Sequence, residues 1–190
     1  MWTNVDLKYK ILLLFIIFSV SVMYISHSDS RLLTEAKGEV TKRWSCGQYQ
    51  NVIDRSRNTM VAKTYTIRYE PILRDMVVSD DLDIDFAIKD PRITYGNVYQ
   101  FTGVITSINE PKENEEKVAD FDRYKTVDVT VLVDNEHYIV CTAKPRKRLI
   151  FFFPIGDIGD MVTVTGFIVG KVSFANGEKY LAMVGISEKL

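Results

Sequence analysis

The sequence predicts a mainly β domain, a five-stranded Greek-key barrel, preceded by an N-terminal membrane segment, a helical stalk and a short extra α/β element. Three observations lead to this prediction: an apolar run begins at Ile11, a helical repeat follows it, and five strand-like stretches fill the C-terminal half. We therefore divide the chain into residues 1–28, the membrane segment; residues 29–60, the stalk; and residues 61–190, the barrel with its N-terminal extension.

Residues 11–25 (ILLLFIIFSVSVMYI) are almost without polar side chains. At 1.5 Å per residue they cover roughly 22 Å, which is shorter than the ~30 Å hydrocarbon core but long enough for the apolar part of a secretory signal. Ser26 and Ser28 form a small-x-small cleavage pattern without a strong A-x-A, so we interpret the run either as a cleaved signal peptide or as an uncleaved signal-anchor.

Lys8 and Lys10 precede this run, and Arg31, Lys37, Lys42 and Arg43 follow it, so the count of basic residues by itself favours the reverse orientation, with the C-terminal part inside. Long domains are translocated largely regardless of their charge. We therefore expect the C-terminal part outside the cytoplasm, either anchored at the inner membrane or secreted to the periplasm.

The composition is that of an ordinary globular protein, with 24 Lys and Arg, 25 Asp and Glu, and a net charge of −1. The net charge is too small to give the protein an electrostatic field that attracts nucleic acid or anionic lipid. The two cysteines, Cys46 and Cys141, are an even number in a chain expected to be exported. A disulfide between them would close a loop of about 95 residues and contribute roughly 4–5 kcal/mol. Two unpaired, buried thiols are the alternative.

After the apolar run, Leu33, Ala36, Val40 and Trp44 recur at spacings of three and four, which predicts a helix. From Val61 a period of two follows until Pro71, which predicts a β-strand: Val61, Lys63, Tyr65, Ile67 and Tyr69 alternate with Ala62, Thr64, Thr66 and Arg68.

Residues 79–90 (SDDLDIDFAIKD) fit two structures, because Leu82, Ile84, Phe86 and Ile88 alternate as in a strand. Ser79, Asp80 and Asp81 are typical of a helix cap and first turn, and we favour a short helix. The alternating acids resemble the start of a calcium-binding loop. Phe86 stands where that loop requires glycine, so we interpret the acids as a solvated face.

Five stretches rich in β-branched and aromatic residues predict five strands, and Asp134-Asn135 and Ala175-Asn176-Gly177 supply turn residues for two hairpins. A longer connection, residues 143–159, separates the third strand from the fourth, and Gly103 lies inside the first. Together these features are typical of the OB-fold, a five-stranded Greek-key barrel. The predicted strands are Val98–Ile108, Thr126–Val133, Glu136–Thr142, Asp160–Gly170 and Lys179–Ile186.

Three segments carry a family resemblance: Tyr95-Gly96, Val98–Ile105 (VYQFTGVI) and Gly159–Gly166 (GDMVTVTG). Over roughly residues 79–187 the chain resembles the tRNA-anti-like group of OB-fold domains in small exported bacterial proteins. The resemblance implies a fold and an envelope location. It implies no biochemistry, because that group has no catalytic residues to carry over and OB-folds host many functions.

OB-folds that bind nucleic acid stack bases on aromatic residues of the second and third strands, inside a basic groove. Alternation turns Val129 and Val131 inward on the second strand, which leaves an outward face with Asp128 and without an aromatic ring. On the third strand only Tyr138 is suitable.

A basic segment follows the third strand and leads into an apolar and aromatic run, Leu149–Phe153. Its charged members, with Tyr138, are the candidate binding residues: Lys144, Arg146, Lys147 and Arg148. The segment is interpreted either as a phosphate or anionic-lipid site or, more simply, as a solvated loop that leads into the core.

Catalytic signatures are missing from the sequence, which contains no G-x-S-x-G, no P-loop and no metal-ligand spacing. His137 and Cys141 share one strand face, but four residues place them about 13 Å apart, too far for a nucleophile and its base. We expect no enzymatic activity, cofactor or metal. The expected function is binding to another envelope protein. The alternative is an OB-fold protein that binds nucleic acid or another polyanion through residues 144–148.

Overall fold

The computed structural model describes residues 7–45, 55–78, 82–109, 126–145, 147–148, 151–152 and 155–190. The chain forms two compact units, Met1–Gly38 and Glu39–Leu190, and each is described by itself. The first contains most of α1 (Leu7–Ser45), which includes the predicted helix around Ala36 and Val40.

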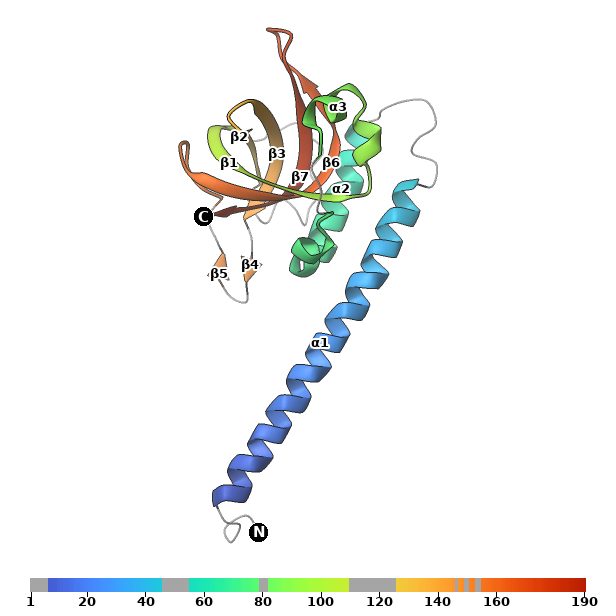
Figure 1. Cartoon of the computed structure of the whole chain (residues 1–190). Helices are drawn as coiled ribbons and strands as arrows, with labels where there is room; N and C mark the ends of the chain where they lie inside the picture. Colours follow the sequence, from blue (N-terminus) through green and yellow to red (C-terminus); the bar gives the residue numbers. More distant parts are fainter. Residues whose placement is uncertain are drawn as a thin grey trace. The chain divides into compact units, whose positions relative to one another are not determined.

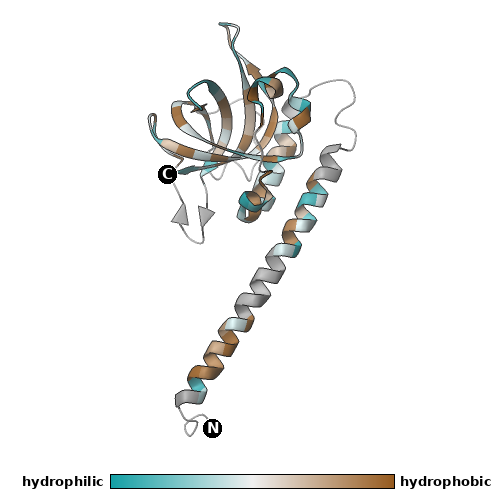
Figure 2. Ribbon diagram, viewed as in Figure 1, coloured by the Kyte–Doolittle hydropathy of each residue, from teal (hydrophilic) through white to brown (hydrophobic). Residues whose placement is uncertain are grey.

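In α1 the large apolar side chains from Ile11 to Phe18 are all exposed, between 44% and 68%. Figure 2 shows them as a hydrophobic band in the N-terminal part of the helix. Within the described part of the chain, no helix is long and apolar enough to cross a membrane.

The second unit contains a closed ring of five strands in the order β1-β2-β3-β7-β6 (Figure 1). Neighbouring strands are antiparallel except β3 and β7, which are parallel. All five correspond to the predicted strands, and the connection after β3 contains the short hairpin of β4 (Lys147–Arg148) and β5 (Phe151–Phe152). The ring strands are β1 (Val98–Asn109), β2 (Val127–Val133), β3 (His137–Pro145), β6 (Met161–Ser173) and β7 (Lys179–Lys189).

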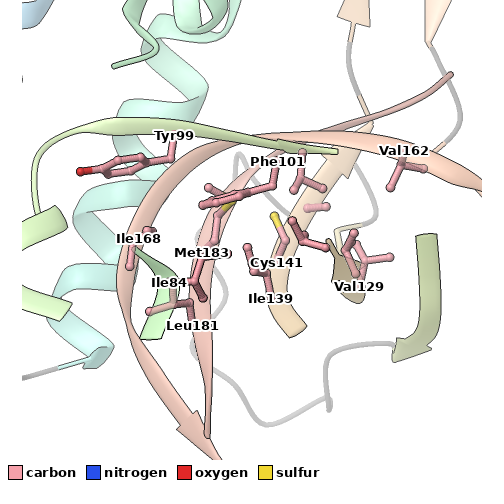
Figure 3. Close-up of a cluster of buried hydrophobic side chains, with 14 of the residues drawn as sticks. Ile84, Tyr99, Phe101, Val129, Ile139, Cys141, Val162, Ile168, Leu181 and Met183 are labelled. Carbon is pink, nitrogen blue, oxygen red and sulfur yellow. The ribbon is translucent and has the colours of Figure 1, made fainter. Parts of the chain in front are cut away.

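The interior of the ring is filled by apolar side chains from every strand. Val129 and Val164 are completely buried, and the alternation on the second strand predicts this for Val129. Figure 3 shows Phe101, Ile139 and Met183 packed together in this core. The five strands therefore bury one continuous apolar face, which is the main source of stability for such a domain.

Gly103 allows β1 to serve both sides of the ring. Residues up to Val104 pair with β6, whereas residues from Val104 onward pair with β2. A Cβ atom on Gly103 would lie 2.2 Å from the carbonyl oxygen of Leu132. Only glycine lets the two strands approach this closely.

The prediction of a β-strand from Val61 to Tyr69 is wrong, because these residues belong to helix α2 (Arg55–Tyr69). The buried residues of α2 recur at helical spacing, and they are Asn58, Ala62, Tyr65, Thr66 and Tyr69. Tyr65 packs on Phe167 of β6, with 5.8 Å between ring centroids, so α2 covers the outer face of the ring there. Tertiary packing thus overrides the strand preference of the β-branched residues.

Three shorter helices complete the unit: η1 (Glu70–Met76), α3 (Ile84–Lys89) and η2 (Pro91–Thr94). The short helix predicted within residues 79–90 is confirmed as α3. Its cap is Asp83, whose carboxylate accepts a hydrogen bond of 2.8 Å from the backbone N–H of Phe86. Ile84 and Ala87 join the core, so α3 packs against the apolar interior of the ring.

Candidate functional site: an aromatic patch on the outer face

Tyr138 and Tyr180 lie side by side on the outer face of the ring. Ile139 of β3 is level with Leu181 of β7 in their parallel pairing, and both side chains point into the core. The residues that precede them therefore point outward. The two tyrosine rings are in contact, with 5.0 Å between their centroids.

A third ring comes from the β6–β7 hairpin. The Phe174 ring lies 4.6 Å from that of Tyr180, centroid to centroid, and Phe174 is 41% exposed. The hairpin turn holds it in place, because the N–H of Phe174 donates to the carbonyl oxygen of Glu178 at 2.9 Å. Figure 1 shows this hairpin extending beyond the rest of the ring. We call the surface of Tyr138, Phe174 and Tyr180 the aromatic patch.

Glu178 gives the aromatic patch a negative charge. Its Oε2 accepts hydrogen bonds from the hydroxyl of Tyr180 and, at 2.7 Å, from Nδ2 of Asn176. These two hydrogen bonds lower the pKa of the Glu178 carboxyl, with Tyr180 as the larger cause. The same hydrogen bond raises the pKa of Tyr180 to about 12. Near neutral pH the patch therefore carries a carboxylate that is oriented by a neutral tyrosine.

The surroundings of the patch are apolar on the sheet and acidic at the turn. Leu132 pairs with Tyr138, Val172 pairs with Tyr180, and both aliphatic side chains are half-buried. Asp134 and Glu136 are exposed at the turn that leads into β3. The sheet therefore offers a partly exposed apolar surface with carboxylates beside it.

The basic segment that the sequence singles out does not form one exposed cluster. Lys144 lies in β3, is 1% exposed, and forms an ion pair with Glu70 of η1. Arg146 lies outside the described residues, and for Lys147 and Arg148 only the backbone is described. The burial of Lys144 removes one of the four positive charges that a polyanion site there would use.

Cys141 is a free thiol in the apolar core, and burial raises its pKa far above the ordinary value. Its predicted partner, Cys46, lies outside the described residues. His137 Nε2 lies 3.6 Å from the Asp85 carboxylate at the end of the ring. Among the described residues, no three His, Cys, Asp or Glu side chains are grouped so that they could hold a metal ion.

Sequence reasoning identified Tyr138 but missed Phe174 and Tyr180. A usable signal was present, because these two residues flank the predicted turn Ala175-Asn176-Gly177. Recognising the patch also required the pairing of the third strand with the fifth, which follows from the closed strand order and not from local periodicity.

In the comparisons with known proteins, no family model, curated protein or solved structure matches this chain. The case for a function therefore comes from the surface itself.

Proposed function

We propose that this chain is a non-enzymatic OB-fold module that binds another protein of the cell envelope through the aromatic patch. The observation that carries the proposal is the contact of three aromatic rings on the outer face of the ring, one from β3 and two from the β6–β7 hairpin. The strand residues beside them are apolar and half-buried. Aromatic side chains of this kind are enriched in protein interfaces, where they supply most of the binding energy.

The strand order supports the OB-fold. The fourth long strand, β6, returns by a long connection to lie beside β1, which is the Greek-key arrangement, and β7 closes the ring against β3. The aromatic patch lies on β3, the third strand of the ring, and on the hairpin of β6 and β7. In OB-folds the second and third strands and the neighbouring loops form the usual binding face.

Charge favours a protein partner over a nucleic acid. Single-stranded nucleic acid needs a basic groove beside its stacking platform, because phosphate contacts supply much of the affinity. Here the platform is bordered by Glu178, Asp134 and Glu136, and Lys144 is already paired with Glu70. A nucleic acid laid across the patch would meet these carboxylates.

We place the domain outside the cytoplasm, at or beyond the inner membrane. Support comes from the apolar run and from the exposure of its side chains from Ile11 to Phe18, a kind of surface that marks contact with a membrane or with another protein. Protease added to intact spheroplasts should digest a tethered domain. Digestion only after lysis would place the domain in the cytoplasm.

The binding proposal is tested by photo-crosslinking in cells. A photoreactive phenylalanine analogue replaces Tyr138 or Phe174 in the full-length chain, and at Asp75 it serves as the control. Asp75 follows Arg74, which pairs with Glu188 near the end of β7, so it marks the opposite end of the strand from Tyr180.

We expect a discrete protein adduct from positions 138 and 174 and none from position 75. Adducts with nucleic acid at positions 138 and 174, or equal protein labelling from all three positions, would contradict the proposal.

A further inference from the structure

We infer that the aromatic patch binds a lysine or arginine side chain of an extended protein segment, with Glu178 as its counter-charge. This inference rests on the proposed function and names the chemistry of the partner. Two independent features support it, the geometry of the rings with their carboxylate and the distribution of charge around them.

The geometry suits a cation. The face of a tyrosine or phenylalanine ring attracts lysine and arginine, and a nearby carboxylate adds to this attraction. Both hydrogen bonds to Glu178 use Oε2, and no residue in the described ranges donates to Oε1. Oε1 can therefore accept a hydrogen bond from a partner's ammonium or guanidinium group, while the two bonds to Oε2 hold the carboxylate in place.

The surrounding charges strengthen this selectivity. Asp134 and Glu136 are exposed at the neighbouring turn. Of the nearby lysines, Lys171 donates from Nζ to the carbonyl oxygens of Ile88 and Lys89, at 3.1 and 3.4 Å, which directs it toward the end of α3. Lys179 precedes Tyr180 in β7, so strand alternation turns it to the opposite face. The patch is thus a locally negative surface on a nearly neutral protein.

The arrangement of the surface around the aromatic patch favours a partner segment in extended conformation. The patch and its half-buried neighbours Leu132 and Val172 lie along the outer face of adjacent strands. A partner chain in extended conformation can place a basic residue over the rings and apolar residues on these neighbours, because alternate side chains then face the sheet.

The inference is tested with labelled peptides and the full-length chain in detergent. The peptides share a Gly-Ser-Val background and differ only at two positions, which are both Lys, both Arg, both Gln or both Glu. Single-stranded DNA is included as a polyanion. Fluorescence anisotropy at low and at physiological salt gives the dissociation constants.

We expect the Lys and Arg peptides to bind at least about fivefold more tightly than the Gln peptide at low salt, the size expected for one exposed charge pair with a ring contact. The preference should shrink as salt rises. The substitution Glu178→Gln should abolish most of the preference, and Glu178→Lys should reverse it in favour of the Glu peptide. Asp75→Asn removes a distant negative charge outside the aromatic patch, so it should keep the preference for basic peptides.

Equal binding of all four peptides, or loss of the preference in Asp75→Asn as in Glu178→Gln, would overturn the inference. Tighter binding of DNA than of the Lys peptide would also overturn it. The crosslinking experiment separates this failure from failure of the proposed function. If Tyr138 still crosslinks to a protein while the peptides show no charge preference, the module binds a protein that is not recognised through a cation.

Discussion

The ammonium group of Lys144 is buried between the ring and η1, where Glu70 balances its charge. Lys144 is 1% and Glu70 11% exposed at the side chain. Removing one member of a buried pair leaves the other charge uncompensated. Glu70→Gln should therefore lower the free energy of unfolding by roughly 3 kcal/mol or more. Urea denaturation followed by circular dichroism measures the loss.

The matched control breaks the second ion pair of η1, between Arg74 and Glu188, whose side chains are 44% and 20% exposed. Ion pairs at the surface contribute only about 0–1 kcal/mol, and Arg74 is the more exposed partner, so Arg74→Gln should change stability little. Replacing both Lys144 and Glu70 with methionine and leucine should recover most of the loss caused by Glu70→Gln. Equal effects of the two glutamine substitutions would show that burial does not set the importance of the Lys144 pair.

Tyr180 should titrate unusually high, because its hydroxyl donates a hydrogen bond to an ionised carboxylate. The pKa of Tyr180 is raised to about 12 from an ordinary value of 10.0. The folded state then holds a proton that the unfolded state loses, so this contribution to stability is complete below pH 10 and disappears as pH rises toward 12. Glu178→Gln should return the pKa toward 10, as measured by the ¹³Cζ shift of Tyr180. An unchanged pKa in that variant would rule out Glu178 as the cause.

At the scale of elements, Gly103 permits the close approach on which ring closure depends. A Cβ atom there would also lie 2.8 Å from Cγ1 of Val131. Gly103→Ala should therefore force β1 away from β2 and lower the melting temperature sharply, by several degrees or more for a domain of this size. Gly38 in α1 is the control, because nothing lies within 4 Å of an added Cβ there. Gly38→Ala should be neutral or slightly stabilising, and a mild Gly103→Ala would show that the strands can separate without cost.

The five strands could be predicted from sequence because each combines β-branched residues with turn residues at its ends. Asp134 and Asn135, for example, both adopt positive φ, 54° and 58°, in the β2–β3 turn. The helix α2 could not be predicted in this way, because Val61, Tyr65 and Ile67 carry strand propensity. The contacts of α2 with β6 and β7, which favour the helix, cannot be read from the local sequence.

The candidate site was predictable only in part for the same reason. Tyr138 stands out on its own strand, but its contact with Tyr180 depends on a pairing between strands that are distant in sequence. Lys144 illustrates the opposite case, in which a residue in a basic run is removed from the surface by a partner on η1. Neither contact leaves a periodic signal in the sequence.

At the scale of the whole molecule, the second unit contains the complete ring and its covering helices. Because its apolar core includes side chains from all five strands and from α3, residues 39–190 should fold alone with a cooperative urea transition. Its midpoint should match that of the full-length chain in detergent. A broad transition without near-ultraviolet circular dichroism would mean that the residues before Glu39 contribute to the fold.

The same fragment tests whether the ring acts as one cooperative unit. Val129 and Val164 are fully buried on different strands, so either aspartate substitution should place an unpaired charge in the shared core. Such a charge costs several kcal/mol, whereas the total free energy of unfolding of a domain is roughly 5–15 kcal/mol. Both variants should therefore be unfolded or nearly so. Leu132→Asp, on the outward face of the strand that carries Val129, should remain folded because its carboxylate reaches water. Val164→Asp could instead unfold β6 and β7 alone while β1 to β3 keep their protection against amide hydrogen exchange. The ring would then consist of two parts that unfold separately. The aromatic patch joins β3 to the β6–β7 hairpin, so it would be lost as soon as either part unfolded.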